Sequence, residues 1–304
     1  MMGNNPLVSV NILSFNRREE LRNTLTKVYE QNYKNIEVIV IDNASIDGTK
    51  EMVENEFDKV KLIALSENIG ASAANLGFKI SKGEYIMILD DDSFPERDTI
   101  EVGLKSFMSD NKIGIVALKI YNKYLNVVET EMFKNNSFSF IGCGALFKKE
   151  LIELIGGYSE DYFLYHNELD LSARSLKAGY SIIYNDSALI VHNFSPRSRG
   201  VIKSDILKSE KRYYYFFVGY SIFIIQNYQF KYLIYFGVKL IVNRLIISIF
   251  YSYWKIFFKA LFDIMKNFKK YFKKRSPFNH ENQKKYLNLI AFIDRDFFPN
   301  YKNH

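Results

Sequence analysis

Residues 84–95 read EYIMILDDDSFP, an apolar run that ends in three consecutive aspartates. An uninterrupted apolar run of this kind is typical of a strand buried on both faces of a parallel sheet. The adjacent carboxylates of Asp90, Asp91 and Asp92 repel one another unless a cation or strong hydrogen-bond donors neutralise them. The stretch therefore predicts a central strand with an acidic cluster at its carboxyl end. The alternative is a solvated turn in which Asp92 or Ser93 caps a helix.

Further apolar runs alternate with helix-like stretches along the first 200 residues. The strand candidates besides 84–90 are 7–13, 36–42, 60–65 and 113–120, and the helix candidates are Arg17–Gln31, Asp47–Phe57, Ala71–Ser81 and Glu96–Ser109. Buried strands separated by helices indicate a parallel sheet that is covered on both sides. We predict an α/β domain over residues 1–200, with a doubly wound, mainly parallel sheet and helices on both faces.

Polar side chains follow three of these strands at the points where the strands end. Ser14, Phe15 and Asn16 follow the first strand, Asp42 ends the second, and Asp90 begins the acidic cluster. Ligands in doubly wound sheets bind beyond the carboxyl ends of the strands, so we expect a binding site at this edge. Carboxylates suit Mg²⁺ or Mn²⁺, which bind phosphates with only one or two protein carboxylates.

The glycines of the chain match neither familiar phosphate-binding loop. The sequences Asn68-Ile-Gly70 and Asn75-Leu-Gly77 supply no Walker lysine and lack the dinucleotide spacing. This argues against a kinase and against a nicotinamide-dependent dehydrogenase, and leaves a diphosphate held by a metal.

Composition indicates a folded protein from a reducing compartment. The chain has 304 residues, 48% of them hydrophobic and 16% aromatic, which is enough for one core with an appendage. Its single cysteine, Cys143, cannot form an internal disulfide. The amino-terminal residues have no basic stretch ahead of an apolar run, so we expect no secretion signal there.

The charge is distributed unevenly between the two ends of the chain. Residues 201–304 carry 19 basic and 6 acidic side chains, whereas the first 200 carry 22 basic and 28 acidic ones. The run 213–230 is uncharged but rich in tyrosine, and Lys239 and Arg244 interrupt the apolar stretch that follows. A spanning helix needs about 20 largely apolar residues. We interpret 201–304 as a helical region of interfacial helices whose lysines face anionic lipid, each adding about 1 kcal/mol.

Two other interpretations of residues 201–304 remain open. The aromatic side chains could be buried in a packed helical subdomain or in a homodimer. Aromatic residues among lysines can also bind nucleic acid by stacking and phosphate contact. The acidic first domain and the lack of any nucleic-acid-binding motif argue against that third reading, so we expect no nucleic acid partner.

Several ordered motifs resemble those of the family 2 inverting glycosyltransferases, which have the GT-A fold. The resemblance covers about residues 7–200. The motifs are VSVNILSFNRREELRNTL (8–25), VIVIDNASIDGT (38–49), ENIGASAANLGFKISKGEYIMILDDDSFP (67–95), GCGALFKKELIELIGGYSEDYFLYHNELDLSARSLKAGY (142–180) and ALIVHNFS (188–195).

The resemblance implies roles for the residues that follow the strands. Ser14, Phe15 and Asn16 would line the nucleoside pocket, Asp42 would bind the edge of the nucleobase, and Asp90 would contact the ribose. The donor would then be a nucleoside-diphosphate sugar.

The resemblance also implies a metal site and a sugar site. Asp92 would hold the Mn²⁺ or Mg²⁺ that bridges the diphosphate, and His192 would complete the metal site. Arg197 and Arg199 lie in a loop that could close over the diphosphate. The donor and acceptor sugars would lie beside Gly142, Cys143, Gly144 and Asp170.

The catalytic base departs from the family pattern Glu-Asp-x-Asp-Leu. This chain has Asn167-Glu168-Leu169-Asp170-Leu171, so Glu168 falls on the base position. An acceptor hydroxyl needs a carboxylate to take its proton. Glu168 and Asp170 are roughly 200° apart on a helix, so both cannot face the acceptor. Carboxylates are also favoured in a first helical turn by the dipole alone.

These observations predict a metal-dependent inverting glycosyltransferase, peripheral on the cytoplasmic face of the cell membrane. Its acceptor would be a lipid-linked or surface glycan, and its second partner an anionic membrane surface. A catalytically silent, membrane-associated adaptor with the same fold is one alternative. A sugar nucleotidyltransferase is another, but its glycine-rich segment and amino-terminal lysine are missing here.

Overall fold

The computed structural model of the chain describes residues 5–134, 137–193 and 209–287. The described residues form two compact units. The first comprises residues 5–160 and 168–193, and the second comprises residues 161–167 and 209–287.

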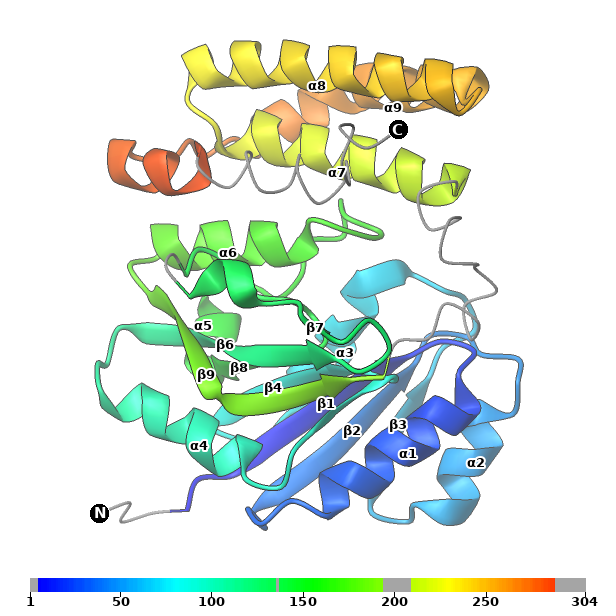
Figure 1. Cartoon of the computed structure of the whole chain (residues 1–304), viewed down its shortest axis with the longest axis vertical. Coiled ribbons are helices and arrows are strands. Elements are labelled where there is room, and N and C mark those ends of the chain that lie inside the picture. Colours follow the sequence, from blue (N-terminus) through cyan, green and yellow to red (C-terminus); the bar gives the residue numbers. More distant parts are fainter. Residues whose placement is uncertain (1–4, 135–136, 194–208, 288–304) are drawn as a thin grey trace. The chain divides into compact units, whose positions relative to one another are not determined.

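A mixed sheet runs through the first unit (Figure 1). Its strands are β1 (Val8–Ser14), β2 (Ile36–Asp42), β3 (Val60–Ala64), β4 (Tyr85–Asp90), β5 (Ser93–Pro95), β6 (Ile113–Asn122), β7 (Val127–Val128), β8 (Ala145–Lys148) and β9 (Ser181–His192). The order is β3-β2-β1-β4-β8-β6-β9-β5, with β7 beside β6. Strands β3, β2, β1 and β4 are parallel, as are β6 and β9, whereas β8 is antiparallel to both of its neighbours. All five strands expected from the sequence are present.

Helices cover both faces of this sheet. They are α1 (Arg18–Tyr29), α2 (Thr49–Glu56), α3 (Ala74–Ile80), α4 (Thr99–Lys105), α5 (Lys149–Ile155) and α6 (Asn167–Lys177), with short 3₁₀ turns at Gly70–Ala73, Ser106–Met108 and Glu131–Phe133. On α1, Leu21, Leu25 and Val28 are buried at helical spacing and pack in the same cluster as residues of α2 and α4. Figure 1 shows α3 behind the sheet, opposite α1 and α2.

Strand β2 shows why the central runs are apolar throughout. Val38 and Val40 belong to the cluster under α1 and α2, whereas Ile39 and Ile41 pack with Ala73 in a second cluster. Because successive side chains point to opposite faces and both faces are covered, the central positions 38–41 are all apolar, and the acidic residues Glu37 and Asp42 lie towards the two ends of the strand.

The second unit is built on three long helices, α7 (Glu210–Asn227), α8 (Phe230–Phe250) and α9 (Trp254–Lys273). Helix α7 carries the uncharged run and is the buried helix of the three: Phe217 stacks on Phe257 of α9 with 5.7 Å between ring centroids, and Phe223 lies 5.5 Å from Tyr286. This part of the tail therefore packs internally, as the subdomain interpretation expected.

Helices α8 and α9 differ from α7 because they leave apolar side chains in solvent. In the described part of the chain, α8 is the one helix whose length and composition suit a membrane span, with a mean hydropathy of 1.9 and only 17% of its most apolar window buried. On α9 the exposed aromatic residues Trp254, Phe258 and Phe262 recur every four residues. This spacing places them on one stripe of the helix.

The short segment 161–167 belongs to the helical unit. Asp161 forms ion pairs with Lys270 of α9 and with Lys274 directly after that helix, at 2.7 and 2.5 Å. The Phe163 ring stacks on Tyr215 of α7 with 4.7 Å between ring centroids. The next residue along the chain after this segment is Glu168.

Candidate active site

Arg17 neutralises the acidic cluster at the end of β4. Its Nη1 atom lies 2.6 Å from Asp91 Oδ1 and 3.0 Å from Asp92 Oδ2. The Asp91 carboxylate is buried and also accepts the backbone N–H of Phe15 at 3.0 Å. Burial opposes the charge on Arg17, but Asp91, Asp92 and Asp90 outweigh it and raise the pKa of the guanidinium. Arg17 is thus a strong donor to two of the three adjacent carboxylates, although burial still raises the pKa of Asp91 to about 7 against its charge.

Pairing of β5 with β9 brings Asp92 to His192. Ser93 of β5 lies opposite His192 in the antiparallel ladder, and the backbone N–H of Asn193 donates to the Asp92 carbonyl at 2.8 Å. The side chains follow the backbone, so Asp92 Oδ1 lies 3.4 Å from His192 Nε2. A carboxylate oxygen and an imidazole nitrogen, both of which can ligate a metal, therefore face each other in a buried position.

Glu129 holds the opposite side of the His192 ring. Its Oε2 atom lies 2.8 Å from Nδ1, and its Oε1 atom accepts from the side-chain amide of Asn122 at 2.7 Å. Burial lowers the pKa of His192, but its contacts with Asp92 and Glu129 prevail and raise it to about 9. A carboxylate on the outer nitrogen of a histidine is the usual arrangement behind a metal-ligating imidazole, because it orients the ring and raises its basicity.

Cys143 is a poorer ligand candidate, although it is close to this pair. One ligand atom each from Glu129, Cys143 and His192 lie within 4.8 Å of one another. Burial, reinforced by Asp90 and Glu129, raises the pKa of the Cys143 thiol well above its usual value. The thiolate is the metal-binding form, so burial disfavours Cys143 as a ligand. His192, whose raised pKa keeps the ring protonated in the absence of a metal, would release that proton when a cation binds.

The residues expected to bind the nucleoside lie together beyond the ends of β1 and β2. The Asp42 carboxylate accepts the backbone N–H of Ser45 at 3.1 Å, and the Ser45 hydroxyl accepts the backbone N–H of Asn16 at 2.8 Å. The Ser14 carbonyl accepts the N–H of the residue after Asp42 at 2.8 Å. Phe15 exposes 42% of its surface beside this network, so its ring is available to a ligand.

Glu168 lies in the first turn of α6, beside Gly142. A Cβ atom at Gly142 would be 2.8 Å from Glu168 Oε1, so a larger residue here would push the carboxylate aside. Burial raises the pKa of Glu168 to about 7, with Asp90 adding to the shift and the backbone N–H of Gly142 opposing it. Because the ideal general base has a pKa near the working pH, Glu168 has the protonation behaviour of a base at neutral pH.

Asp170 has a structural partner on its own helix. Its carboxylate accepts from Arg174 Nε at 2.8 Å, and the same guanidinium donates to the carbonyls of Ile155 and Gly157 at 2.7 Å each. This arrangement ties α6 to the end of α5. The role of Asp170 beside the sugars stays a prediction.

The other expected sugar-site residues gather around Cys143. The hydroxyl of Ser93 donates to the Cys143 carbonyl at 2.7 Å, which ties this loop to the acidic cluster. A Cβ atom at Gly144 would lie 2.7 Å from Ile190 of β9, so this position needs glycine. Arg197 and Arg199 lie outside the described residues.

Sequence reasoning did not assign Arg17, Asp91 or Glu129 to the site. Arg17 carried a usable signal, because a basic residue directly after the first strand lies at the same sheet edge as the acidic run. Glu129 carried none, since it lies in a turn-rich stretch far from every motif and reaches His192 only through the pairing of β6 with β9.

Comparison with known proteins identifies the family. The model of glycosyl transferase family 2 matches residues 9–171, more than half of the chain. The chain therefore belongs to glycosyl transferase family 2, as its motifs suggested.

Relatives and solved structures agree with this assignment. An uncharacterized glycosyltransferase of Haemophilus influenzae is 37% identical over 114 residues, which is 36% of this chain and 45% of that protein. The UDP-Glc:alpha-D-GlcNAc-diphosphoundecaprenol beta-1,3-glucosyltransferase WfaP of Escherichia coli is 35% identical over 91 residues, or 29% of this chain and 36% of its own. The matches thus span less than half of the length of these two relatives.

The fold is shared with a mannosyltransferase, PcManGT from Pyrobaculum calidifontis, solved in complex with GDP-Man and Mn²⁺. The two structures agree with a TM-score of 0.60 at 21% identity, over 98% of this chain and 82% of that one. This likeness confirms the GT-A fold that the sequence predicted.

Proposed function

We propose that this chain is a metal-dependent inverting glycosyltransferase that moves a hexosyl or deoxyhexosyl unit from a nucleoside-diphosphate sugar to a glycan hydroxyl. The observation that carries the proposal is the paired arrangement of Asp92 and His192, 3.4 Å apart, at the same sheet edge as a glutamate whose pKa is about 7. This reaction requires ligands for a divalent ion and a general base that accepts the proton of the acceptor hydroxyl.

The chemistry assigned to Glu168 is proton transfer. Its carboxylate takes the proton of the acceptor hydroxyl while the hydroxyl oxygen forms a bond to the anomeric carbon. The bond from that carbon to the diphosphate oxygen breaks, and the nucleoside diphosphate leaves with the bonding electrons. A single displacement inverts the anomeric centre.

Asp92 and His192 are the residues that would hold the divalent ion. A bound ion would stabilise the negative charge that gathers on the leaving diphosphate. The donor set of one carboxylate oxygen and one imidazole nitrogen suits Mn²⁺ better than Mg²⁺, which prefers oxygen ligands throughout. Glu129 would orient the imidazole from behind.

The nucleoside would bind beside Phe15. The exposed Phe15 ring offers an apolar surface to a base or ribose, and Asn16 and Asp42 are held nearby through Ser45. Asp90, half-buried at the end of β4, donates its backbone N–H to the Ser93 hydroxyl at 3.0 Å, and the same hydroxyl donates to the Cys143 carbonyl.

We assign the acceptor to lipid-linked or surface glycans and the protein to the cytoplasmic face of the membrane. WfaP, by its name, glucosylates a sugar on diphosphoundecaprenol. The helical unit adds independent support, because an α8 that leaves its apolar side chains exposed and an α9 with a stripe of aromatics beside lysines suit an anionic membrane surface.

Calorimetry of nucleotide binding tests the proposal on the full chain. UDP, GDP, dTDP and CMP are titrated with and without Mn²⁺, into the wild type, Asp92→Ala and the control Asp58→Ala, whose carboxylate is exposed and remote from the acidic cluster in sequence. We expect one diphosphate to bind in a Mn²⁺-dependent manner to the wild type and the control, and Asp92→Ala to lose that dependence. Absence of nucleotide binding by the folded wild type would instead favour the silent adaptor.

A further inference from the structure

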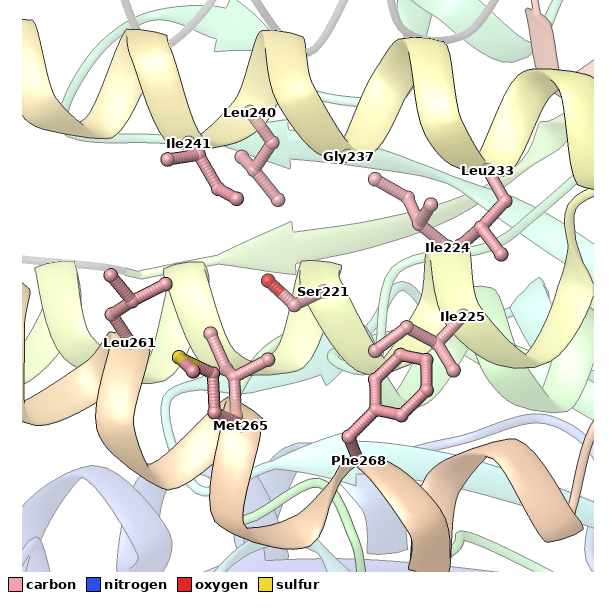
Figure 2. A pocket seen from close by; sticks show the side chains of 11 residues that line it. Ser221, Ile224, Ile225, Leu233, Gly237, Leu240, Ile241, Leu261, Met265 and Phe268 are labelled. Carbon is pink, nitrogen blue, oxygen red and sulfur yellow. The ribbon is translucent and has the colours of Figure 1, made fainter.

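An apolar cavity of about 420 Å³ lies between α7, α8 and α9, entirely within the helical unit. Figure 2 shows it between α8 and the other two helices, with Ile224 and Ile225 of α7 pointing toward it. Ser221 is the polar side chain of the lining, and its hydroxyl already donates to the carbonyl of Phe217 at 2.8 Å. A ligand here would therefore be hydrocarbon, and the volume falls in the range of small-molecule sites.

The opening of the cavity is formed by apolar residues that are exposed. Ile241 of α8 is 39% exposed, and Met265 and Phe268 of α9 are 69% and 41% exposed. The neighbouring residues Val242 and Phe272 are exposed as well. The cavity is thus continuous with a face of α8 and α9 that is unfavourable in water, which is typical of a surface that contacts lipid or a partner.

The charge around this face identifies the kind of partner. Residues 209–287 carry 15 basic and 3 acidic side chains. Lys266 and Lys269 directly follow Met265 and Phe268, and both are exposed. A second copy of this chain would bring the same excess of positive charge to the interface, whereas an anionic lipid complements it.

We propose that the cavity is a slot for one hydrocarbon chain of an anionic membrane phospholipid, with the headgroup beside Lys266 and Lys269. The inference builds on the membrane association included in the proposed function. It goes further by assigning one bound lipid to a defined place, in addition to general contact with the surface. A chain that enters from the membrane would bury its methylene groups against side chains of all three helices.

Gly237 makes the proposal testable, because it lines the cavity in the middle of α8. A Cβ atom at this position would meet nothing within 4 Å. Gly237→Phe can therefore add its Cβ atom without a clash and place a phenyl ring in the slot, and replacing a glycine inside a helix also favours the helix. The matched control is Val238→Phe, since Val238 is the adjacent residue, is 58% exposed and does not line the cavity.

The experiment uses phosphatidylglycerol with a photoreactive diazirine on its acyl chain, mixed into phosphatidylethanolamine vesicles. The full-length wild type and both variants are labelled on these vesicles, and peptide mass spectrometry locates the labelled residues. Vesicle sedimentation and thermal unfolding are measured on the same samples. We expect labels in the peptides around 233–241 and 261–268, and a loss of about ten-fold in Gly237→Phe but not in Val238→Phe, because the phenyl ring takes the place of several methylene groups.

Two results would overturn the slot. Equal labelling of wild type and Gly237→Phe would show that the chain does not enter the cavity, as would labels confined to outward residues of α8 and α9. If all three proteins sediment with the vesicles in either case, the membrane association stands and only the slot fails. If the wild type does not sediment with the vesicles, the membrane association and the lipid slot fail together, whereas the proposed transfer reaction is not affected by that result.

Discussion

Asp92 Oδ1 lies 3.4 Å from His192 Nε2, although β6 and β8 as well as several helices lie between the two residues in the sequence. The antiparallel pairing of β5 with β9 sets this distance through the backbone. Two paired strands provide the rigid support that a preorganised metal site needs, since sites built on strands are more precise than sites on loops.

Glu129→Gln tests whether the residue behind His192 supports metal binding. The change preserves shape but removes the charge that faces Nδ1, and we expect the affinity for Mn²⁺ in the presence of the preferred diphosphate to fall by about 10- to 100-fold. Calorimetry measures it. Glu131→Gln, an exposed residue close by in the sequence, is the control, and equal Mn²⁺ affinity in the two variants would remove Glu129 from the metal site.

The raised pKa of Glu168 predicts how the transfer rate depends on pH. A base works only when it is deprotonated, and burial raises the pKa of Glu168 to about 7. Below that pH the rate should fall about ten-fold per pH unit. Glu168→Gln should bind the donor normally and lose transfer by about 10²- to 10⁴-fold. A flat rate between pH 5 and about 8, or full transfer by the variant, would point to another base.

The same shift predicts a dependence of stability on pH. The pKa of Glu168 in the folded protein lies above its ordinary value of 4.5, so the folded state holds the proton more tightly than the unfolded state. This contribution to stability is present below pH 4.5 and is lost as the pH rises through about 7. Glu168→Gln should therefore melt at a higher temperature than the wild type at alkaline pH but not at acidic pH. If the melting temperatures of the variant and the wild type differ by the same amount at acidic and at alkaline pH, the raised pKa does not belong to Glu168.

Arg17→Ala should destabilise the protein strongly. It leaves the buried carboxylate of Asp91 without its cation, a change that typically costs about 3–5 kcal/mol. Denaturant unfolding measures the effect. Arg22→Ala, which removes an arginine of α1 that pairs with Glu56 at the surface, should change stability little because such pairs contribute little. Similar losses in the two variants would show that the cluster does not depend on Arg17.

Trp254 reports on membrane contact, because it is the single tryptophan of the chain and 44% of it is exposed at the start of α9. Its emission should shift to shorter wavelength with phosphatidylglycerol vesicles and be quenched by brominated acyl chains. The shift should weaken in high salt, which screens the lysines of α9. Sedimentation with vesicles but no change in emission would place the contact elsewhere on the protein.

The amino-acid sequence predicted much of the sheet but only part of the site. Runs such as 38–41 are apolar because both faces of the strand are covered, and this is visible in the local pattern. The short strands β5, β7 and β8 have no such pattern. Strands β5 and β8 form through hydrogen bonds to strands that are distant in the sequence, whereas β7 pairs with the adjacent end of β6. Strand β8 is also antiparallel in a sheet predicted to be mainly parallel.

The acidic run at residues 90–92, the polar residues after the first two strands and the order of the family motifs were determined by the sequence alone, because each is a property of neighbouring residues. Only the tertiary structure decided that Arg17 neutralises Asp91, that Glu129 supports His192, and that α7 is buried while α8 is exposed. The hydrophobicity of a helix indicates that it avoids water. It does not indicate whether the helix packs against other parts of the protein or against another apolar phase. That distinction depends on packing between residues that are distant in the chain, which local sequence does not encode.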